Sequence, residues 1–190
     1  MMTEIALAQR IDRLESRADL AELCSAYCMA CDDRDMPRLA SLFTQDIHIR
    51  SVDGAMNATG VADAIAMFNR MFGIRGPSYH WTHDRFVAFD PEDLDRATGV
   101  VLAHAETTPN GIVSIAALRY NDVYRREAGR WRFAERLLSF LYYMPMAEFI
   151  QHFRDDKRVA VQGDWRAGDY PEKLQSWRDW HRTHGAISGG

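Results

Sequence analysis

The sequence has no excess of basic residues. Its 23 Lys and Arg residues are outnumbered by 27 Asp and Glu residues, which gives a formal net charge of −4 at pH 7. Domains that bind nucleic acid usually carry a basic patch. The arginines of residues 124–132 alternate with apolar residues, as the exposed positions of strands do. We therefore expect no nucleic acid among the partners.

The sequence also has no long apolar run. None of its hydrophobic stretches approaches the roughly 20 residues that a membrane-spanning helix needs. Residues 1–10 lack the basic start and apolar segment of a secretory signal. We therefore predict a cytoplasmic protein that does not act at a membrane.

Cysteine is scarce and clustered. Cys24, Cys28 and Cys31 are the only three cysteines, and all lie in one short segment. A disulfide framework would need cysteines spread along the chain, and a zinc site would need a second cluster of ligands. Neither pattern is present. We expect these thiols to be small buried groups in a reducing compartment.

Nothing in the sequence resembles a glycine-rich phosphate loop or a dinucleotide fingerprint. Asp32, His80, His83 and His104 could be imagined as metal ligands, but their spacing is not that of a helical His-x3-His pair. We predict neither a cofactor nor a metal. Ligands that converge from several strands would remain an alternative, because spacing does not reveal them.

The 190 residues, of which 47% are hydrophobic, suffice for one domain with a substantial core. Helical spacing of apolar residues predicts three N-terminal helices, over residues 4–31, 37–43 and 61–73. Alternating apolar residues predict strands over 45–52, 79–89, 96–107, 112–126 and 130–143. Asn110-Gly111 between two of these runs indicates a hairpin turn.

Helices followed by a run of antiparallel strands indicate an α+β fold. We expect a strongly bent sheet around the N-terminal helices, enclosing a conical cavity. Residues 1–144 would form this domain. Residues 145–190 would form a partly helical C-terminal extension that packs on the domain or on a neighbouring subunit, and they carry Trp165, Trp177 and Trp180.

Acid–base residues gather in one part of the chain. Tyr27 and Asp32 lie near the end of the first predicted helix, His80 begins a strand, and His104 lies inside the next strand. A carboxylate held against an imidazole is the simplest cofactor-free device for proton transfer. His83 has the opposite strand parity to His80 and would face the other side.

His104 shares its strand face with Val100 and Leu102. We therefore expect its imidazole to point into an apolar interior, where it would need a partner. From the residues alone, each of these side chains could also be structural. Asp32 could be an ordinary residue at a helix end, and His80 could be a core histidine that bonds a backbone carbonyl.

Several segments resemble the SnoaL-like branch of the nuclear transport factor two superfamily. The pair Tyr27 and Asp32 matches a Tyr-x4-Asp pattern of bile acid 7α-dehydratases, and residues 31–39 resemble the segment that carries the catalytic aspartate of scytalone dehydratases. Residues 80–83, His-Trp-Thr-His, fall where these families and lindane dehydrochlorinases place a catalytic histidine. Residues 129–134 fit the Gly-x-Trp-x-Phe pattern of the last long strand.

The resemblance covers about residues 5–143. It implies a cone-shaped, curved mixed β-sheet wrapped around N-terminal helices, the cystatin-like α+β barrel, and an enzyme that needs no cofactor or metal. It also implies a homodimer or homotrimer. Where bile acid dehydratases have an arginine on the final strand, this chain has Phe140, so a substrate carboxylate or thioester bound by that arginine does not carry over.

The resemblance also implies a function, dehydratase-type elimination on a neutral, hydrophobic cyclic small molecule. Asp32 would orient His80, His80 would remove a proton, Tyr27 would stabilise developing charge, and His104 would assist the leaving group. Large side chains that could line the cavity, or equally form plain core, are Phe43, Met56, Met67, Phe68, Met71, Phe72, Trp81, Phe86 and Phe140, with His83 beside them.

Two alternatives stay open. An isomerase or a polyketide-type cyclase could use the same base and pocket, because only the fate of the enolate differs. A non-catalytic ligand-binding or assembly module is the second alternative, and it predicts that Asp32 and His80 point apart or into solvent.

Overall fold

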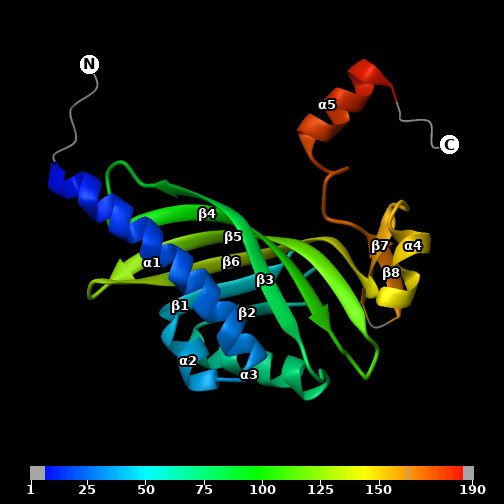
Figure 1. Ribbon diagram of the computed structural model, residues 1–190, viewed down its shortest axis with the longest axis horizontal. Coiled ribbons are helices and arrows are strands. Elements are labelled where there is room, and N and C mark those ends of the chain that lie inside the picture. The colour runs from blue at the N-terminus through cyan, green and yellow to red at the C-terminus, as the bar shows by residue number, and fades with distance from the viewer. Residues whose placement is uncertain (1–6, 162, 186–190) are drawn as a thin grey trace.

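The computed structural model describes residues 7–161 and 163–185 (Figure 1). The first three residues of the helix predicted from residue 4, and residues 186–190 of the extension, lie outside this range. The elements in chain order are α1 Leu7–Asp32, α2 Met36–Ser41, β1 Phe43–Ser51, β2 Asn57–Thr59, α3 Val61–Gly73, β3 Tyr79–Phe89, β4 Arg96–Thr107, β5 Ser114–Glu127, β6 Arg130–Pro145, the 3₁₀ helix η1 Met146–Glu148, α4 Phe149–His152, β7 Lys157–Val161, β8 Asp164–Ala167 and α5 Gln175–His184.

A curved, unclosed sheet carries the fold, in the strand order β2-β1-β6-β5-β4-β3. The β1–β6 pair is parallel, and the other neighbours on this path are antiparallel. Register shifts in β5 and β6 mark irregularities in the longest pair, and bulges of this kind bend a sheet. Helix α1 lies across the sheet, with α2 and α3 at one end (Figure 1). The predicted α+β fold with a bent mixed sheet is confirmed.

Helix α1 packs one face on the sheet because its apolar residues recur at helical spacing. Leu20, Leu23, Tyr27 and Ala30 are buried on this face. The helix ends at Asp32, and Asp35 then caps α2 by accepting a hydrogen bond from the backbone N–H of residue 38 at 3.0 Å. Asp32 is thereby brought to the start of β3.

A buried ion pair lies under α1, in the middle of the sheet. Arg136 on β6 donates two hydrogen bonds to Asp122 on β5, at 2.9 and 2.8 Å, and both side chains are almost completely buried. The Tyr124 hydroxyl donates a third bond to this carboxylate at 2.8 Å. The guanidinium also stacks on the rings of Tyr27 and Phe133, 4.1 and 3.9 Å from their centroids. The ion pair thus connects two central strands to the helix.

The extension is partly helical as predicted, with helices α4 and α5, but it also contains strands that the sequence did not predict. It contributes strands β7 and β8, and β7 pairs with β6 through Tyr143 and Val159. Sequence reasoning also missed the short strand β2. A buried Arg158 on β7 ties the extension together through Glu172, 2.8 Å away. Helix α5 projects from this part of the molecule (Figure 1), with Trp177 exposed.

Within the described residues, no helix is both long and apolar enough to span a membrane. The expectation that the cysteines are small buried groups is confirmed, because Cys24, Cys28 and Cys31 are free and buried. Burial raises the pKa of Cys28 and of Cys31 to about 12. These thiols therefore stay protonated at neutral pH and act as small core groups.

Candidate active site

Asp32 and His80 are in direct contact. One carboxylate oxygen of Asp32 lies 2.5 Å from Nδ1 of His80, and the other accepts a hydrogen bond from the backbone N–H of His80 at 2.8 Å. Only 10% of the Asp32 side chain and 13% of the His80 side chain are exposed. The carboxylate therefore holds the first residues of β3 and the imidazole ring at the same time.

The turn after α1 supports this contact. Arg34 has a positive φ of 60°, which turns the chain back at the end of the helix. Its guanidinium donates to the carbonyl of Gly76 at 2.8 Å and to the hydroxyl of Ser78 at 3.1 Å. Ser78 lies 3.4 Å from Asp32. Arg34 thus ties the end of α1 to the segment that leads into β3.

The contact decides which nitrogen of His80 could react. A carboxylate accepts hydrogen bonds, so Nδ1 of the imidazole is the donor and the neutral ring carries its proton there. The lone pair then lies on Nε2. In the described part of the chain, no hydrogen bond to Nε2 is found. This arrangement suits a general base.

His80 lines a small inner cavity of about 60 Å³. Tyr27 and Cys31 on α1 line the same cavity. Of the large apolar residues expected around a pocket, five lie there, Met56, Phe68, Met71, Phe72 and Phe140. A space of this size holds no more than a few water-sized groups. The inner cavity can therefore receive only one edge of a ring compound.

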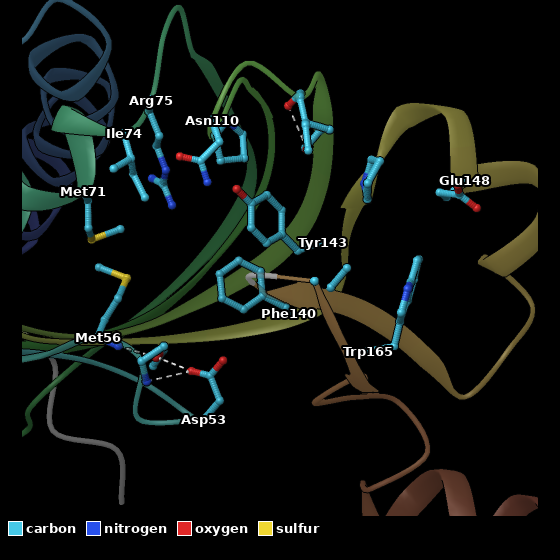
Figure 2. A pocket seen from close by; sticks show the side chains of 18 residues that line it. Asp53, Met56, Met71, Ile74, Arg75, Asn110, Phe140, Tyr143, Glu148 and Trp165 are labelled. Carbon is cyan, nitrogen blue, oxygen red and sulfur yellow. Dashed lines mark hydrogen bonds between the residues drawn. The ribbon is translucent and has the colours of Figure 1, made fainter.

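A larger outer cavity of about 880 Å³ opens beside it. Met56, Met71 and Phe140 line both cavities, and Figure 2 shows them in the wall of the outer one. The extension supplies the far wall through Glu148 and Trp165. Ligand pockets commonly measure about 300–1,000 Å³. The two cavities together are large enough for a cyclic small molecule.

Tyr27 is buried and lines the inner cavity. Burial raises the pKa of its hydroxyl well above the ordinary value, so the group stays protonated. Its ring packs edge-on against Phe43, 6.3 Å between centroids, and against Phe68 at the same distance. Tyr27 thus offers a hydrogen-bond donor inside an apolar space.

The expectation that His104 points into the interior is wrong. In the β3–β4 register His80 is opposite Ala105, whereas His104 is opposite Trp81. Ala105 is buried and His104 is exposed, so His80 and His104 lie on opposite faces of the sheet. His83 is exposed as well, away from His80 as parity predicted, and its Nε2 lies 2.6 Å from Nδ1 of His104. Neither His83 nor His104 lines the His80 cavity.

Four other residues that could have lined the cavity, or formed core, line neither cavity. Trp81 and Phe86 are exposed, 40% and 69%, because they face away from α1. Phe43 and Met67 are buried in the core and line neither cavity. Alternation identifies residues that share a face, but it does not say which face is covered.

Sequence reasoning missed polar residues at the junction of the two cavities. Arg75 and Tyr143 line both cavities, and Asn110 lines the outer one. Asn110 carried only a turn signal, and Arg75 carried no signal at all. Within residues 7–161 and 163–185, no group of three or more His, Cys, Asp or Glu residues could hold a metal ion.

Comparison with known proteins places these features in context. Residues 12–137 match the family model of the SnoaL-like domain. The chain is 28% identical over 142 residues to a gamma-hexachlorocyclohexane dehydrochlorinase of Sphingobium indicum, covering 72% of this chain and 88% of the relative. Removal of hydrogen chloride by that relative is a lyase reaction.

Solved structures agree on the fold. A hexachlorocyclohexane dehydrochlorinase from Novosphingobium barchaimii superposes with a TM-score of 0.67 at 23% identity, over 73% of this chain and 94% of that one. A scytalone dehydratase-like protein of Novosphingobium aromaticivorans superposes with a TM-score of 0.66 at 17% identity, over 72% and 91%.

Proposed function

The chain belongs to the SnoaL-like domain family, and we propose that it is a cofactor-free lyase that performs elimination on a hydrophobic cyclic small molecule. The single observation that carries this proposal is the contact between Asp32 and His80 at the inner end of an apolar cavity. The relatedness to dehydrochlorinases supports the reaction class.

In the proposed reaction, Nε2 of His80 removes a proton from a ring carbon. The electron pair of the broken C–H bond forms the new C=C bond, and the leaving group departs with the electrons of its own bond. The imidazole becomes positively charged, and the adjacent Asp32 carboxylate stabilises that charge. A positioned general base of this kind contributes about 10²–10⁴-fold to a rate.

Tyr27 has a supporting role in this proposal. Its buried, protonated hydroxyl would donate a hydrogen bond to a substrate carbonyl or to a departing oxygen. The leaving-group role expected of His104 does not hold, because that residue is on the other face of the sheet. A chloride would need no proton on departure, whereas a hydroxide would leave as water by taking up the proton that His80 has removed.

Product analysis tests the reaction class. The purified protein would be incubated with γ-hexachlorocyclohexane, with the β-hydroxy ketone 3-hydroxy-1-tetralone and with a β,γ-unsaturated 3-oxosteroid. The proposal predicts a product lighter than its substrate by HCl or water. A product of unchanged mass would instead favour the isomerase, and a new carbon–carbon bond the cyclase. Saturable binding of these compounds without conversion would favour a binding module.

We propose further that the chain forms a homodimer or homotrimer. Apolar side chains are exposed on the outer side of the sheet, Trp81, Phe86 and Leu102 among them, and Trp177 and Trp180 are exposed on α5. Exposed apolar surface of this kind often marks a subunit interface. Light scattering at micromolar concentration should give two or three times the mass of one chain, and the mass of a monomer would contradict this proposal.

A further inference from the structure

Arg75 is the one Arg or Lys among the described residues that line either cavity. It follows the last turn of α3 and lines the inner cavity with His80 as well as the outer cavity. Within the described chain, no hydrogen bond or ion pair engages its guanidinium. A cation is thus presented to an otherwise largely apolar space.

The acidic residues of the outer cavity have other partners. Asp53 accepts hydrogen bonds from Arg166 of β8, at 2.8 and 3.1 Å. Glu148 lies across the cavity from Arg75 in Figure 2 and pairs with His152, 3.5 Å away. Neither carboxylate neutralises Arg75, so the positive charge remains available to a ligand.

Further polar groups stand beside this cation. The backbone N–H of Asn110 donates to the carbonyl of Ile74 at 2.7 Å, and Arg75 forms a β-bridge with Pro109, so the β4–β5 loop is held against the end of α3. Figure 2 shows the Asn110 amide next to Arg75, with the Tyr143 hydroxyl pointing toward them. These donors converge on one side of the cavity.

We infer that Arg75 binds an oxyanion of the substrate, most simply a carboxylate carried by its apolar ring. A guanidinium binds a carboxylate through two parallel hydrogen bonds, and Asn110 and Tyr143 supply further donors. The anionic group would sit at the junction of the cavities while the reacting edge reaches His80. This inference replaces the expectation of a neutral substrate, and it rests on the proposed function because it assigns the anion to the molecule that reacts.

A purely structural role for Arg75 makes a different prediction. A cation just beyond a helix C-terminus interacts favourably with the helix dipole. If this were its only role, Arg75→Gln would lower the melting temperature slightly and leave ligand affinity unchanged. A measurement of ligand affinity therefore distinguishes a structural role of Arg75 from a role in binding an oxyanion.

Two fluorescent probes with one scaffold provide that measurement. 1-Anilinonaphthalene-8-sulfonate carries an oxyanion, and N-phenyl-1-naphthylamine is the same molecule without it. Both probes would be titrated into the full chain. Trp165 lines the outer cavity, so energy transfer from Trp165 to a probe would show that the probe is bound there. A Trp165→Phe variant identifies that part of the signal.

We expect Arg75→Gln to lower the affinity for the sulfonate probe at least about tenfold, since hydrogen bonds to charged groups are among the strong ones. The affinity for the neutral probe should change less than about twofold. The affinity of Arg75→Lys for the sulfonate probe should lie between those of the unmodified protein and Arg75→Gln. Arg70→Gln, at an exposed position of α3, is the matched control and should bind both probes normally. Unchanged sulfonate affinity in Arg75→Gln, or an equal loss for both probes, would overturn the inference.

The outcome is independent of catalysis. Neither probe carries a leaving group, so their binding reports the anion site without any turnover. A failure of the Arg75 prediction would therefore leave the elimination proposal standing, and a failure of the elimination proposal would leave an anion site at Arg75.

Discussion

The Asp32 carboxylate contacts His80 at two places, the ring Nδ1 at 2.5 Å and the backbone N–H at 2.8 Å. Because both contacts use the same side chain, the position of the strand and the orientation of the ring depend on one residue. The contact joins the last residue of α1 to the second residue of β3.

Asp32→Asn should reduce the elimination rate by about 10²-fold or more while the fold is kept. The amide of asparagine has the same shape but no negative charge, so it does not stabilise a protonated imidazole. It also does not require that Nδ1 of His80 carry the proton. Asp33→Asn changes the neighbouring exposed carboxylate and should leave the rate unchanged. Initial rates on a compound that the protein converts would measure the effect, and similar losses in both variants would argue against a specific role for Asp32.

The outer-face pair of His83 and His104 should make stability depend on pH. Burial, and then the proximity of His83, lowers the pKa of His104. The unfolded chain therefore binds a proton at this residue more readily than the folded chain. The resulting stability is fully present above the ordinary imidazole value of about 6.5 and is lost as pH falls through the lowered value.

Urea unfolding between pH 8 and pH 5 would measure this dependence. His104→Gln should flatten the loss of stability on acidification, whereas His48→Gln, on β1 and away from the pair, should not. An unmodified protein that gains stability as pH falls through this window, with the gain removed by His104→Gln, would contradict the expected direction of the effect.

The Arg136–Asp122 pair should matter mainly for stability. Asp122→Asn leaves the Arg136 charge buried without its counter-ion, and breaking a buried pair in this way costs about 3–5 kcal/mol. Asp46→Asn, which breaks an exposed pair with Arg125, should cost less than about 1 kcal/mol. The free energy of unfolding in denaturant gives both values, and equal costs would show that burial does not decide them.

The thiols should be inert in the folded protein. With the pKa of Cys28 and of Cys31 near 12, only on the order of one thiol in 10⁴ is ionised at pH 8. Iodoacetamide at pH 8 should therefore leave the cysteines unmodified in native buffer and alkylate them in denaturant, as intact-mass measurement would show. Rapid alkylation of the native protein would mean that α1 opens.

Much of the fold could be predicted because strand alternation and turn residues are local signals. Strands β3 and β4 have the predicted bounds, and Asn110-Gly111 ends the turn between β4 and β5. Strand β2, with three residues, is too short to show a period, and β7 pairs with β6 through a long-range contact. Such pairing depends on tertiary context more than on the strand itself.

The site could be predicted only where residues matched positions that are known from the family. Asp32 and His80 matched family positions, and the structure brings them together. His104 was misplaced because small residues, Ala103 and Ala105, cover the inner face of β4, while the larger Leu102 is partly exposed on the outer one. Arg75 gave no signal, since its place at the cavity depends on how α3 meets the β4–β5 loop.

The central claim is that His80 is the general base. The most direct test compares elimination rates of the unmodified protein and His80→Ala, with His48→Gln as a control at a half-buried histidine that lines neither cavity, and with circular dichroism to verify folding. We predict a loss of about 10²–10⁴-fold or more in His80→Ala and none in His48→Gln. Near-normal turnover by a folded His80→Ala protein would contradict the account.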